Sequence, residues 1–190
     1  MTQPPPGWPV RIVLASGSPQ RIKLLQPLGV HLEVRPADID EAPLPGETPP
    51  VYADRLAKAK AMAIADSDDI VVAADTVVDL DGRIMGQPAD RHDALTILSQ
   101  LSGRSHLVHT GLAVRTGSTL SSIVATTEVT FTEVSDTFLA WYIDTGEPFG
   151  KAGAYAIQGL GSLLVSKVQG SLTSVIGLPL SELHRLILGC

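Results

Sequence analysis

The chain has 190 residues, of which 44% are hydrophobic and 18% charged, so it is long enough to bury a core as a globular protein. Its net charge of −6 excludes a broad basic surface for nucleic acid, and no apolar run is long enough to span a bilayer. The single cysteine, Cys190, excludes a disulfide within the chain and a cysteine-based metal site. These features predict a cytoplasmic protein with no nucleic-acid or membrane partner.

The first predicted elements, after a proline-rich tail over residues 1–10, are a strand, a small-residue turn and a helix. Ile12-Val13-Leu14 is typical of a buried strand, and Ser18 before Pro19 is a helix-start signal. Such a turn directs free backbone N–H groups and the positive end of the helix dipole to one point, which suits a phosphate. Ser16, Ser18 and Arg21 add side-chain donors there. An ordinary strand-to-helix turn has the same pattern, so these residues alone leave both interpretations open.

The next predicted elements are a strand over residues 32–35, a polar loop over 36–50 and a helix over 49–65. Arg55 and Lys60 lie five residues apart on this helix and point about 140° apart, so we expect them not to serve the same site. Helix charges of this kind are usually solvated. Glu41, in the loop, suits either a metal ligand or a solvated acid.

An apolar run over residues 70–74 predicts a buried strand with Asp75 at its end. The chain is expected to continue extended over 76–80 and to return over 83–85 after a turn. A buried carboxylate is costly unless it is hydrogen-bonded, paired with a cation or close to a metal. Asp75 therefore indicates either a functional acid or a structural cap. Thr76, beside it, either donates to a substrate oxygen or serves only as a strand former.

The segment from Val77 to Gly82 is similar to the nucleophile motif of haloacid-dehalogenase-type phosphatases, in which Asp79 would be the nucleophile. Arg83 stands where that motif has threonine, and Asp81 with Gly82 already predicts a hairpin turn. This phosphatase interpretation is kept as an alternative.

The second half of the chain is predicted to alternate helices with strands that pair antiparallel, which indicates an α/β protein with a mixed sheet and flanking helices. The predicted elements are a helix from Asp90, strands over 105–115 and 119–133, a helix after Ser135, a glycine-rich stretch over 146–161, a strand over 162–168 and a short helix after Pro179. Within the glycine-rich stretch, Lys151 and Gln158 indicate either backbone close to a ligand or a simple glycine-rich hairpin. The amide of Gln158 is suited to the edge of a base.

Taken together, six stretches in the same order resemble the Maf family of nucleoside triphosphate pyrophosphatases from Leu14 to about Leu183. They are Leu14–Pro19 with Arg21; Arg55-Leu56-Ala57 with Lys60-Ala61; Ala74–Val78; Leu101-Ser102-Gly103 with His106 and Thr110-Gly111; Lys151–Tyr155 with Ile157-Gln158-Gly159; and Gly170-Ser171 with Val175–Leu180.

The resemblance implies a single catalytic domain over residues 11–190, with two lobes around a central cleft, similar to inosine triphosphate pyrophosphatases. It also implies a homodimer that depends on Mg²⁺ or Mn²⁺. The implied reaction cleaves a nucleoside triphosphate between the α and β phosphates, giving the monophosphate and pyrophosphate. The branch that it favours acts on dTTP and UTP.

The resemblance further assigns roles to residues by position. Asp75 matches the catalytic acid, which from its chemistry would act as the general base and would also ligate the metal together with Glu41. Ser16, Arg21 and Lys60 match positions around the phosphates. Thr76 and Gln158 match positions tied to the choice of base.

Two departures from the family pattern remove positive charge. Gln20 stands where the family usually has a second arginine that helps set substrate choice, so Gln20 is a candidate specificity residue. Gln87 stands in a turn that usually carries a lysine on the phosphate side. They motivate a second alternative, a nucleotide-binding regulator with little catalysis.

Overall fold

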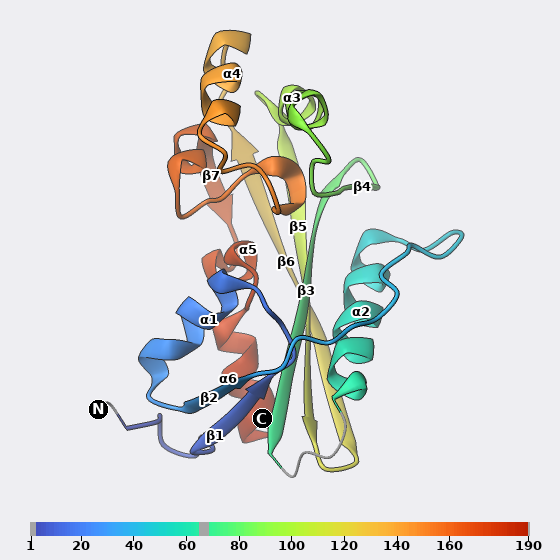
Figure 1. Cartoon of the computed structure of the whole chain (residues 1–190), viewed down its shortest axis with the longest axis vertical. Helices are drawn as coiled ribbons and strands as arrows, with labels where there is room; N and C mark the ends of the chain where they lie inside the picture. The colour runs from blue at the N-terminus through green and yellow to red at the C-terminus, as the bar shows by residue number, and fades with distance from the viewer. Residues whose placement is uncertain (1–2, 65–68, 190) are drawn as a thin grey trace.

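A mixed sheet forms the centre of the computed structural model, which describes residues 3–64 and 69–189 (Figure 1). Its strands are β1 (Arg11–Leu14), β2 (His31–Val34), β3 (Ile70–Leu80), β4 (Arg83–Met85), β5 (Ser105–Thr116), β6 (Thr119–Phe131) and β7 (Val165–Gln169). Its α-helices are α1 (Pro19–Leu25), α2 (Pro49–Ala63), α3 (Arg91–Leu101), α4 (Asp136–Asp144), α5 (Leu172–Ile176) and α6 (Leu180–Leu188), and short 3-10 helices are η1 (Gln26–Leu28), η2 (Ala152–Ala154) and η3 (Leu160–Leu164).

The strand order is β2-β1-β3-β5-β6-β7, with β4 beside β3. The strand β1 runs parallel to β2 and β3, whereas the pairs β3–β4, β3–β5, β5–β6 and β6–β7 are antiparallel. The predicted α/β class with a mixed sheet and flanking helices is therefore confirmed. No described helix is long and apolar enough to cross a membrane.

Alternating apolar side chains on β1 and β3 let helices cover both faces of the lower sheet (Figure 1). Leu14 and Val72 pack with α1 and α6 on one face, and Val13 and Val71 pack with α2 on the other. A third apolar cluster joins the upper ends of β3, β5 and β6 to α3 and α4. The long strands thus connect two groups of helices, one at each end of the sheet.

One edge of β3 changes partner along its length. Residues 70–72 pair with β1, and residues 78–80 pair with β4. Neither strand pairs with residues 73–77, so this part of the edge opens to the space between the two groups of helices. Side chains from both faces of β3 reach that space.

Two predictions about these elements need correction, one helix was missed, and one predicted boundary lies outside the described residues. Asp75 lies in the middle of β3 and not at a strand end, because the strand continues beyond it to Leu80. The strand predicted over 162–168 begins only at Val165, because the backbone N–H groups of Leu160 and Gly161 donate to the Glu147 carboxylate and the chain forms η3 there. The helix α5 was not predicted. The end predicted for the second helix, near residue 65, falls outside the described residues.

Candidate active site

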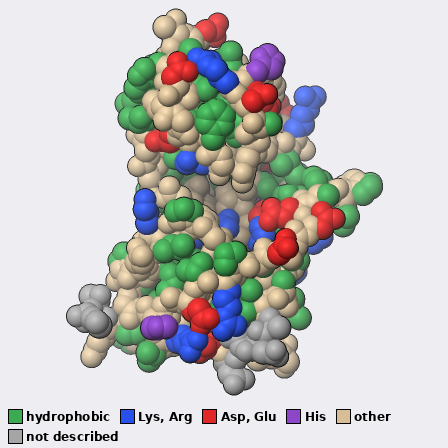
Figure 2. Space-filling model, viewed as in Figure 1, with side chains coloured by type: hydrophobic (Ala, Val, Ile, Leu, Met, Phe, Trp, Pro, Cys, Tyr) green, Lys and Arg blue, Asp and Glu red, His purple; other side chains and the backbone are tan. Residues whose placement is uncertain are grey.

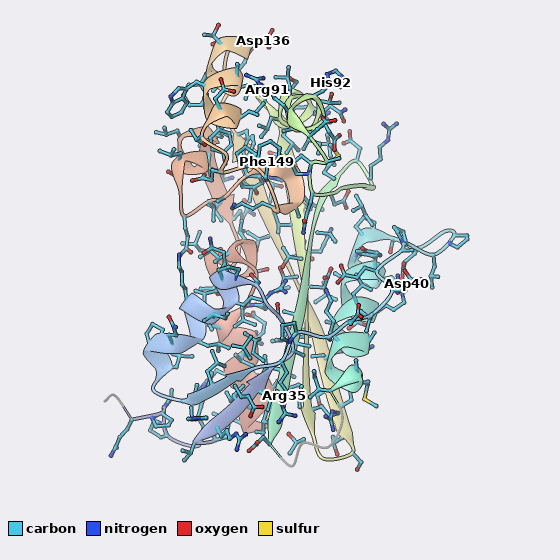
Figure 3. The ribbon with its side chains drawn as sticks, in the orientation of Figure 1. Arg35, Asp40, Arg91, His92, Asp136 and Phe149 are labelled. Carbon is cyan, nitrogen blue, oxygen red and sulfur yellow. The ribbon has the colours of Figure 1, made fainter. Side chains whose placement is uncertain are left out.

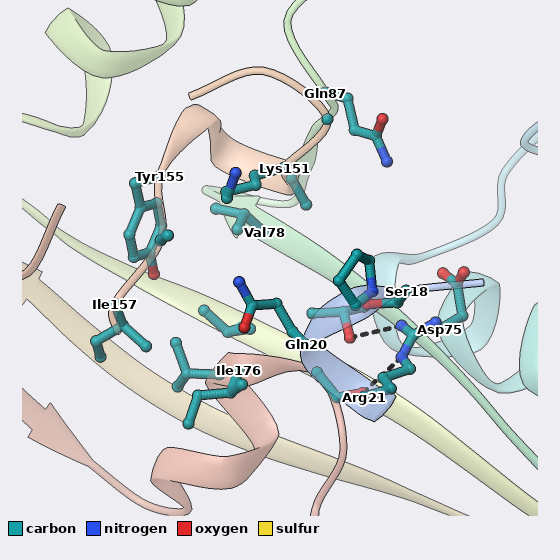
Figure 4. Close-up of a pocket in the computed structure, with 18 of the residues that line it drawn as sticks. Ser18, Gln20, Arg21, Asp75, Val78, Gln87, Lys151, Tyr155, Ile157 and Ile176 are labelled. Carbon is teal, nitrogen blue, oxygen red and sulfur yellow. Dashed lines mark hydrogen bonds between the residues drawn. The ribbon is translucent and has the colours of Figure 1, made fainter. Parts of the chain in front are cut away.

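A cavity of about 400 Å³ lies at the open edge of β3. Figure 2 shows the molecule hollowed between its upper and lower parts, and Figure 4 shows the side chains that face the cavity. Every residue predicted to bind substrate or metal lines the cavity except Ser16, whose hydroxyl oxygen accepts a hydrogen bond from the lining residue Arg21. These wall residues are Ser18, Gln20, Arg21, Glu41, Lys60, Asp75, Thr76, Gln87, Lys151 and Gln158.

The turn between β1 and α1 places Ser18 at the lower side of the cavity. The Ser18 backbone N–H donates to Ser16 Oγ over 3.3 Å, which closes the turn. Ser18 stands at the N-cap position as predicted, but its hydroxyl makes no capping hydrogen bond. The Ser18 side chain therefore remains available to a ligand in the cavity.

Arg21 is buried, with 9% of its surface exposed, and three acceptors fix its guanidinium. Its Nε donates to the Gly177 carbonyl over 2.8 Å, Nη1 to Ser16 Oγ over 2.9 Å and Nη2 to Thr76 Oγ1 over 3.2 Å. Burial lowers the pKa of Arg21, and the charges of Asp75 and Glu41 oppose that change, so the group stays protonated. A fixed positive charge at this point favours an anionic ligand.

Thr76 belongs to a directional chain of hydrogen bonds. Thr110 Oγ1 donates to the Ser174 carbonyl over 2.8 Å, so the hydrogen between Thr110 and Thr76, 3.0 Å apart, comes from Thr76. The Thr76 hydrogen is therefore committed to Thr110 in the nucleotide-free protein, and the Thr76 oxygen accepts from Arg21. Donation from Thr76 to a substrate oxygen stays a prediction.

Asp75 and Lys60 form a buried ion pair next to the cavity, with 2.7 Å between Lys60 Nζ and Asp75 Oδ1. Glu41 Oε1 lies 2.8 Å from the same Nζ atom. Burial raises the pKa of the Asp75 carboxyl, and the charges of Lys60 and Arg21 oppose the rise. The expectation of a solvated Lys60 is wrong, because only 8% of its surface is exposed.

The two carboxylates that meet at Lys60, those of Glu41 and Asp75, are candidate ligands for a divalent cation. Among the residues described, no group of three or more His, Cys, Asp or Glu side chains is arranged to hold a metal. Mg²⁺, however, is commonly held by one or two carboxylates together with substrate phosphates. Glu41 and Asp75 fit a cation shared in this way with a nucleotide.

The wall opposite Arg21 and Asp75 comes from the glycine-rich stretch over 146–161 and is more apolar than the wall that carries those charges (Figure 4). Tyr155 and Ile157 face the cavity, and Gln158 is exposed there with its amide free of hydrogen bonds to other described residues. Lys151 Nζ donates to the Glu147 carbonyl over 2.6 Å, which holds its ammonium at the rim. This stretch forms η2 and η3 and not the simple hairpin that was the alternative.

Sequence reasoning missed several groups that shape the site. The carbonyls of Gly177 and Ser174 accept from Arg21 and Thr110, and no side-chain pattern marks a backbone acceptor. Arg55 was expected to be solvated, but it binds Glu47 through Nε–Oε1 at 2.6 Å and Nη2–Oε2 at 2.8 Å. In the sequence, this part of β5 was marked only by Thr110-Gly111, one of the stretches that resemble the Maf family.

The suggested phosphatase nucleophile has a structural role. Asp79 Oδ1 accepts from the Gly82 backbone N–H over 2.7 Å, and Oδ2 lies 3.1 Å from His109 Nε2. Both oxygens are therefore occupied, and Asp79 does not line the cavity that holds Asp75 and Arg21.

The fold and the cavity define a mixed α/β protein with a polar cleft suited to an anionic ligand. The chain belongs to the Maf family, since the family described as Maf-like protein matches residues 11–189. It is 50% identical over 182 residues to a dTTP/UTP pyrophosphatase of Anaeromyxobacter dehalogenans (strain 2CP-C), covering 93% of this chain and 92% of that protein. It is 46% identical over 178 residues to a dTTP/UTP pyrophosphatase of Myxococcus xanthus (strain DK1622), covering 93% and 90%.

A solved structure, that of the Staphylococcus aureus Ham1 protein, aligns with a TM-score of 0.45 at 20% identity. The alignment covers 66% of this chain and 72% of that chain.

Proposed function

We propose that the protein is a nucleoside triphosphate pyrophosphatase that hydrolyses dTTP and UTP to the monophosphate and pyrophosphate. The observation that carries this proposal is the buried Asp75–Lys60 pair beside the fixed Arg21. Relatives at 46–50% identity that are named dTTP/UTP pyrophosphatase support the choice of reaction and of base.

In this proposal Asp75 is the general base. Lys60 occupies Oδ1, and Oδ2 makes no hydrogen bond to another described residue, so Oδ2 can accept the proton of a water that attacks the α-phosphorus. Burial raises the Asp75 pKa, which strengthens the base, and the charge of Lys60 opposes that rise by favouring the ionised carboxylate.

Positive groups from the lower wall bind the triphosphate. Arg21 directs its remaining N–H groups to a phosphate, Ser18 offers a hydroxyl, and Lys60 offers an ammonium that contacts both carboxylates in the free protein. A bound Mg²⁺ or Mn²⁺, held by Glu41 and Asp75, would neutralise charge on the phosphates and on the leaving pyrophosphate. Lys151 lies at the rim, across the cavity from these groups.

The upper wall is the part that would meet the base. Tyr155 and Ile157 offer apolar surface, and the free amide of Gln158 can both donate to and accept from a pyrimidine edge. The Thr76 hydroxyl contributes to the choice of base indirectly. It accepts from Arg21 and so fixes the guanidinium that would position the phosphates, and with them the base.

The direct test is a panel of nucleoside triphosphates with Mg²⁺ or Mn²⁺, in which pyrophosphate and orthophosphate are measured separately. We expect pyrophosphate from dTTP and UTP. Asp75→Asn should lower kcat by roughly 10²–10⁴-fold while the protein stays folded. The matched Asp79→Asn variant should retain turnover, whereas orthophosphate release that depends on Asp79 would favour the phosphatase alternative.

The regulator alternative rests on Gln20 and Gln87, which both line the cavity with neutral side chains. It predicts that dTTP raises the melting temperature without any pyrophosphate release. Turnover by the wild type would exclude the regulator alternative. Such turnover would also mean that the active site tolerates both glutamines.

A cytoplasmic location and a homodimer complete the proposal. The composition of the chain favours the location and the family resemblance implies the homodimer, which sedimentation of the purified protein tests.

A further inference from the structure

The loop that carries Glu41 has little regular structure of its own. Residues 36–48, here called the acidic loop, form no helix or strand and run beside the start of α2 (Figure 3, near the label of Asp40). The Glu41 side chain is 53% exposed, so its own burial does not hold it against Lys60. Contacts elsewhere in the loop must therefore fix its position.

Arg55 on α2 makes the strongest of these contacts. Its guanidinium binds both oxygens of Glu47, at 2.6 and 2.8 Å, and Nη2 also donates to the Ala42 carbonyl over 3.0 Å. The Glu47 side chain is 4% exposed, in contrast to most ion pairs on a protein surface. A bidentate arginine–carboxylate pair has a fixed geometry, so Arg55 ties two points of the acidic loop to α2.

Tyr52 holds a third point of the acidic loop, at Glu41, next to Ala42. Its hydroxyl donates to the Glu41 carbonyl over 2.8 Å, and the Arg55 guanidinium lies 5.4 Å from the centre of its ring. Tyr52 and Arg55 are three residues apart, so they lie on the same face of α2. Together they fix the carbonyls of Glu41 and Ala42, the backbone from which the Glu41 side chain extends to Lys60.

We infer that Arg55, together with Tyr52, is a positioning residue that holds Glu41 at the active site. The inference deepens the proposed function and rests on it for its catalytic consequence. Arg55 is not part of the cavity wall, so it acts without touching the substrate. It acts through Glu41, and hence on the binding of the divalent cation and the phosphates.

The first test is hydrogen exchange in the nucleotide-free protein, which does not depend on activity. We expect Arg55→Gln to accelerate exchange in residues 36–48, including the Leu44 amide, which donates to Glu47 Oε2 over 3.0 Å. The matched control is Lys58→Gln, which removes a partly exposed ion pair with Asp54 on the same helix and should leave the loop unchanged. Equal exchange in Arg55→Gln and the wild type would overturn the inference.

The second test measures Mn²⁺ binding by electron paramagnetic resonance, in the presence of UTP under conditions too brief for turnover. Arg55→Gln and Glu41→Gln should each weaken binding on the order of tenfold, as is typical when a supporting contact of a metal ligand is lost. Tyr52→Phe should weaken it less, and Arg55→Lys should recover part of the loss. Unchanged binding in Arg55→Gln would contradict the positioning role.

The third test asks whether Arg55 acts through Glu41. In the Arg55→Gln/Glu41→Gln double variant, the loss in Mn²⁺ affinity should match that of Glu41→Gln alone. Losses that multiply would show that Arg55 acts independently and would overturn the inference. Should the wild type release no pyrophosphate, the proposed function fails, while exchange and Mn²⁺ binding still decide the role of Arg55.

Discussion

Lys60 Nζ lies 2.7 Å from Asp75 Oδ1, and each of the two side chains is 10% exposed. A buried ammonium and a buried carboxylate each lose hydration, and their pairing offsets that loss. Glu41 adds a second carboxylate to the same ammonium, 2.8 Å from Nζ. In the nucleotide-free protein Lys60 is therefore the counter-ion of both acids that are proposed to hold the divalent cation.

Lys60→Gln should tighten the binding of Mn²⁺ to the nucleotide-free protein, because two neighbouring carboxylates lose their shared positive partner. We expect roughly tenfold tighter binding, equivalent to about 1.4 kcal/mol, together with weaker binding of UTP. Paramagnetic resonance titration without nucleotide measures the first effect. Adding Asp75→Asn to Lys60→Gln should abolish the gain, and weaker Mn²⁺ binding in Lys60→Gln would contradict the role of counter-ion.

Thr76→Val should weaken nucleotide binding without removing a group that contacts the base. The change keeps the shape of the side chain but deprives Arg21 Nη2 of its acceptor at 3.2 Å and Thr110 of its partner. We expect KM for UTP to rise roughly tenfold and stability to fall by about 1–3 kcal/mol. Thr126→Val removes a similar strand hydroxyl outside the cavity and serves as control. An unchanged KM with lowered stability would limit Thr76 to a structural role.

Local signals in the sequence predicted much of the framework. The apolar run before Ser16, the Ser18-Pro19 pair and the Asp81-Gly82 turn each determine local geometry within a few residues. The turn occurs as predicted, with positive φ at both Asp81 and Gly82. The burial of Asp75 also followed from its apolar neighbours.

The partners within the site were not predictable in the same way, because they depend on packing between distant segments. Lys60 meets Asp75 only because α2 lies on the face of β3 to which Asp75 points. Helix periodicity gives the angle between Arg55 and Lys60 but does not show that the acidic loop passes both. The 3-10 helix at residues 160–164 depends on Glu147, which is remote from it in the sequence.

Gly111→Ala should destabilise the protein strongly, because α2 packs directly on β5 at this residue. A Cβ atom there would lie 2.2 Å from the Ala53 carbonyl oxygen, and backbone cannot move aside as a flexible side chain can. We expect a loss of about 3 kcal/mol in the free energy of unfolding, measured with urea. Gly86→Ala, where no atom lies within 4 Å of the new Cβ, should change it by less than about 0.5 kcal/mol. Similar stabilities for the two variants would contradict the close packing.

His106 should make the protein sensitive to acid. It is buried against Phe131 and Tyr155, its Nε2 lies 2.9 Å from the Tyr155 hydroxyl, and Nδ1 has no partner among the described residues. Burial lowers the pKa of His106 from 6.5 to about 4. The unfolded chain therefore takes up a proton below pH 6.5 that the folded protein does not take up until about pH 4.

The stability that neutral His106 provides is thus complete above pH 6.5 and is lost as the pH falls from 6.5 toward 4. The full shift corresponds to about 3 kcal/mol. His106→Phe should lower stability at pH 7, because the Tyr155 hydroxyl loses its partner, but should flatten the decline in acid. Urea unfolding between pH 7.5 and about 4.5 measures both effects, with exposed His92→Gln as control. A decline equally steep in His106→Phe and the wild type would assign the acid sensitivity to other groups.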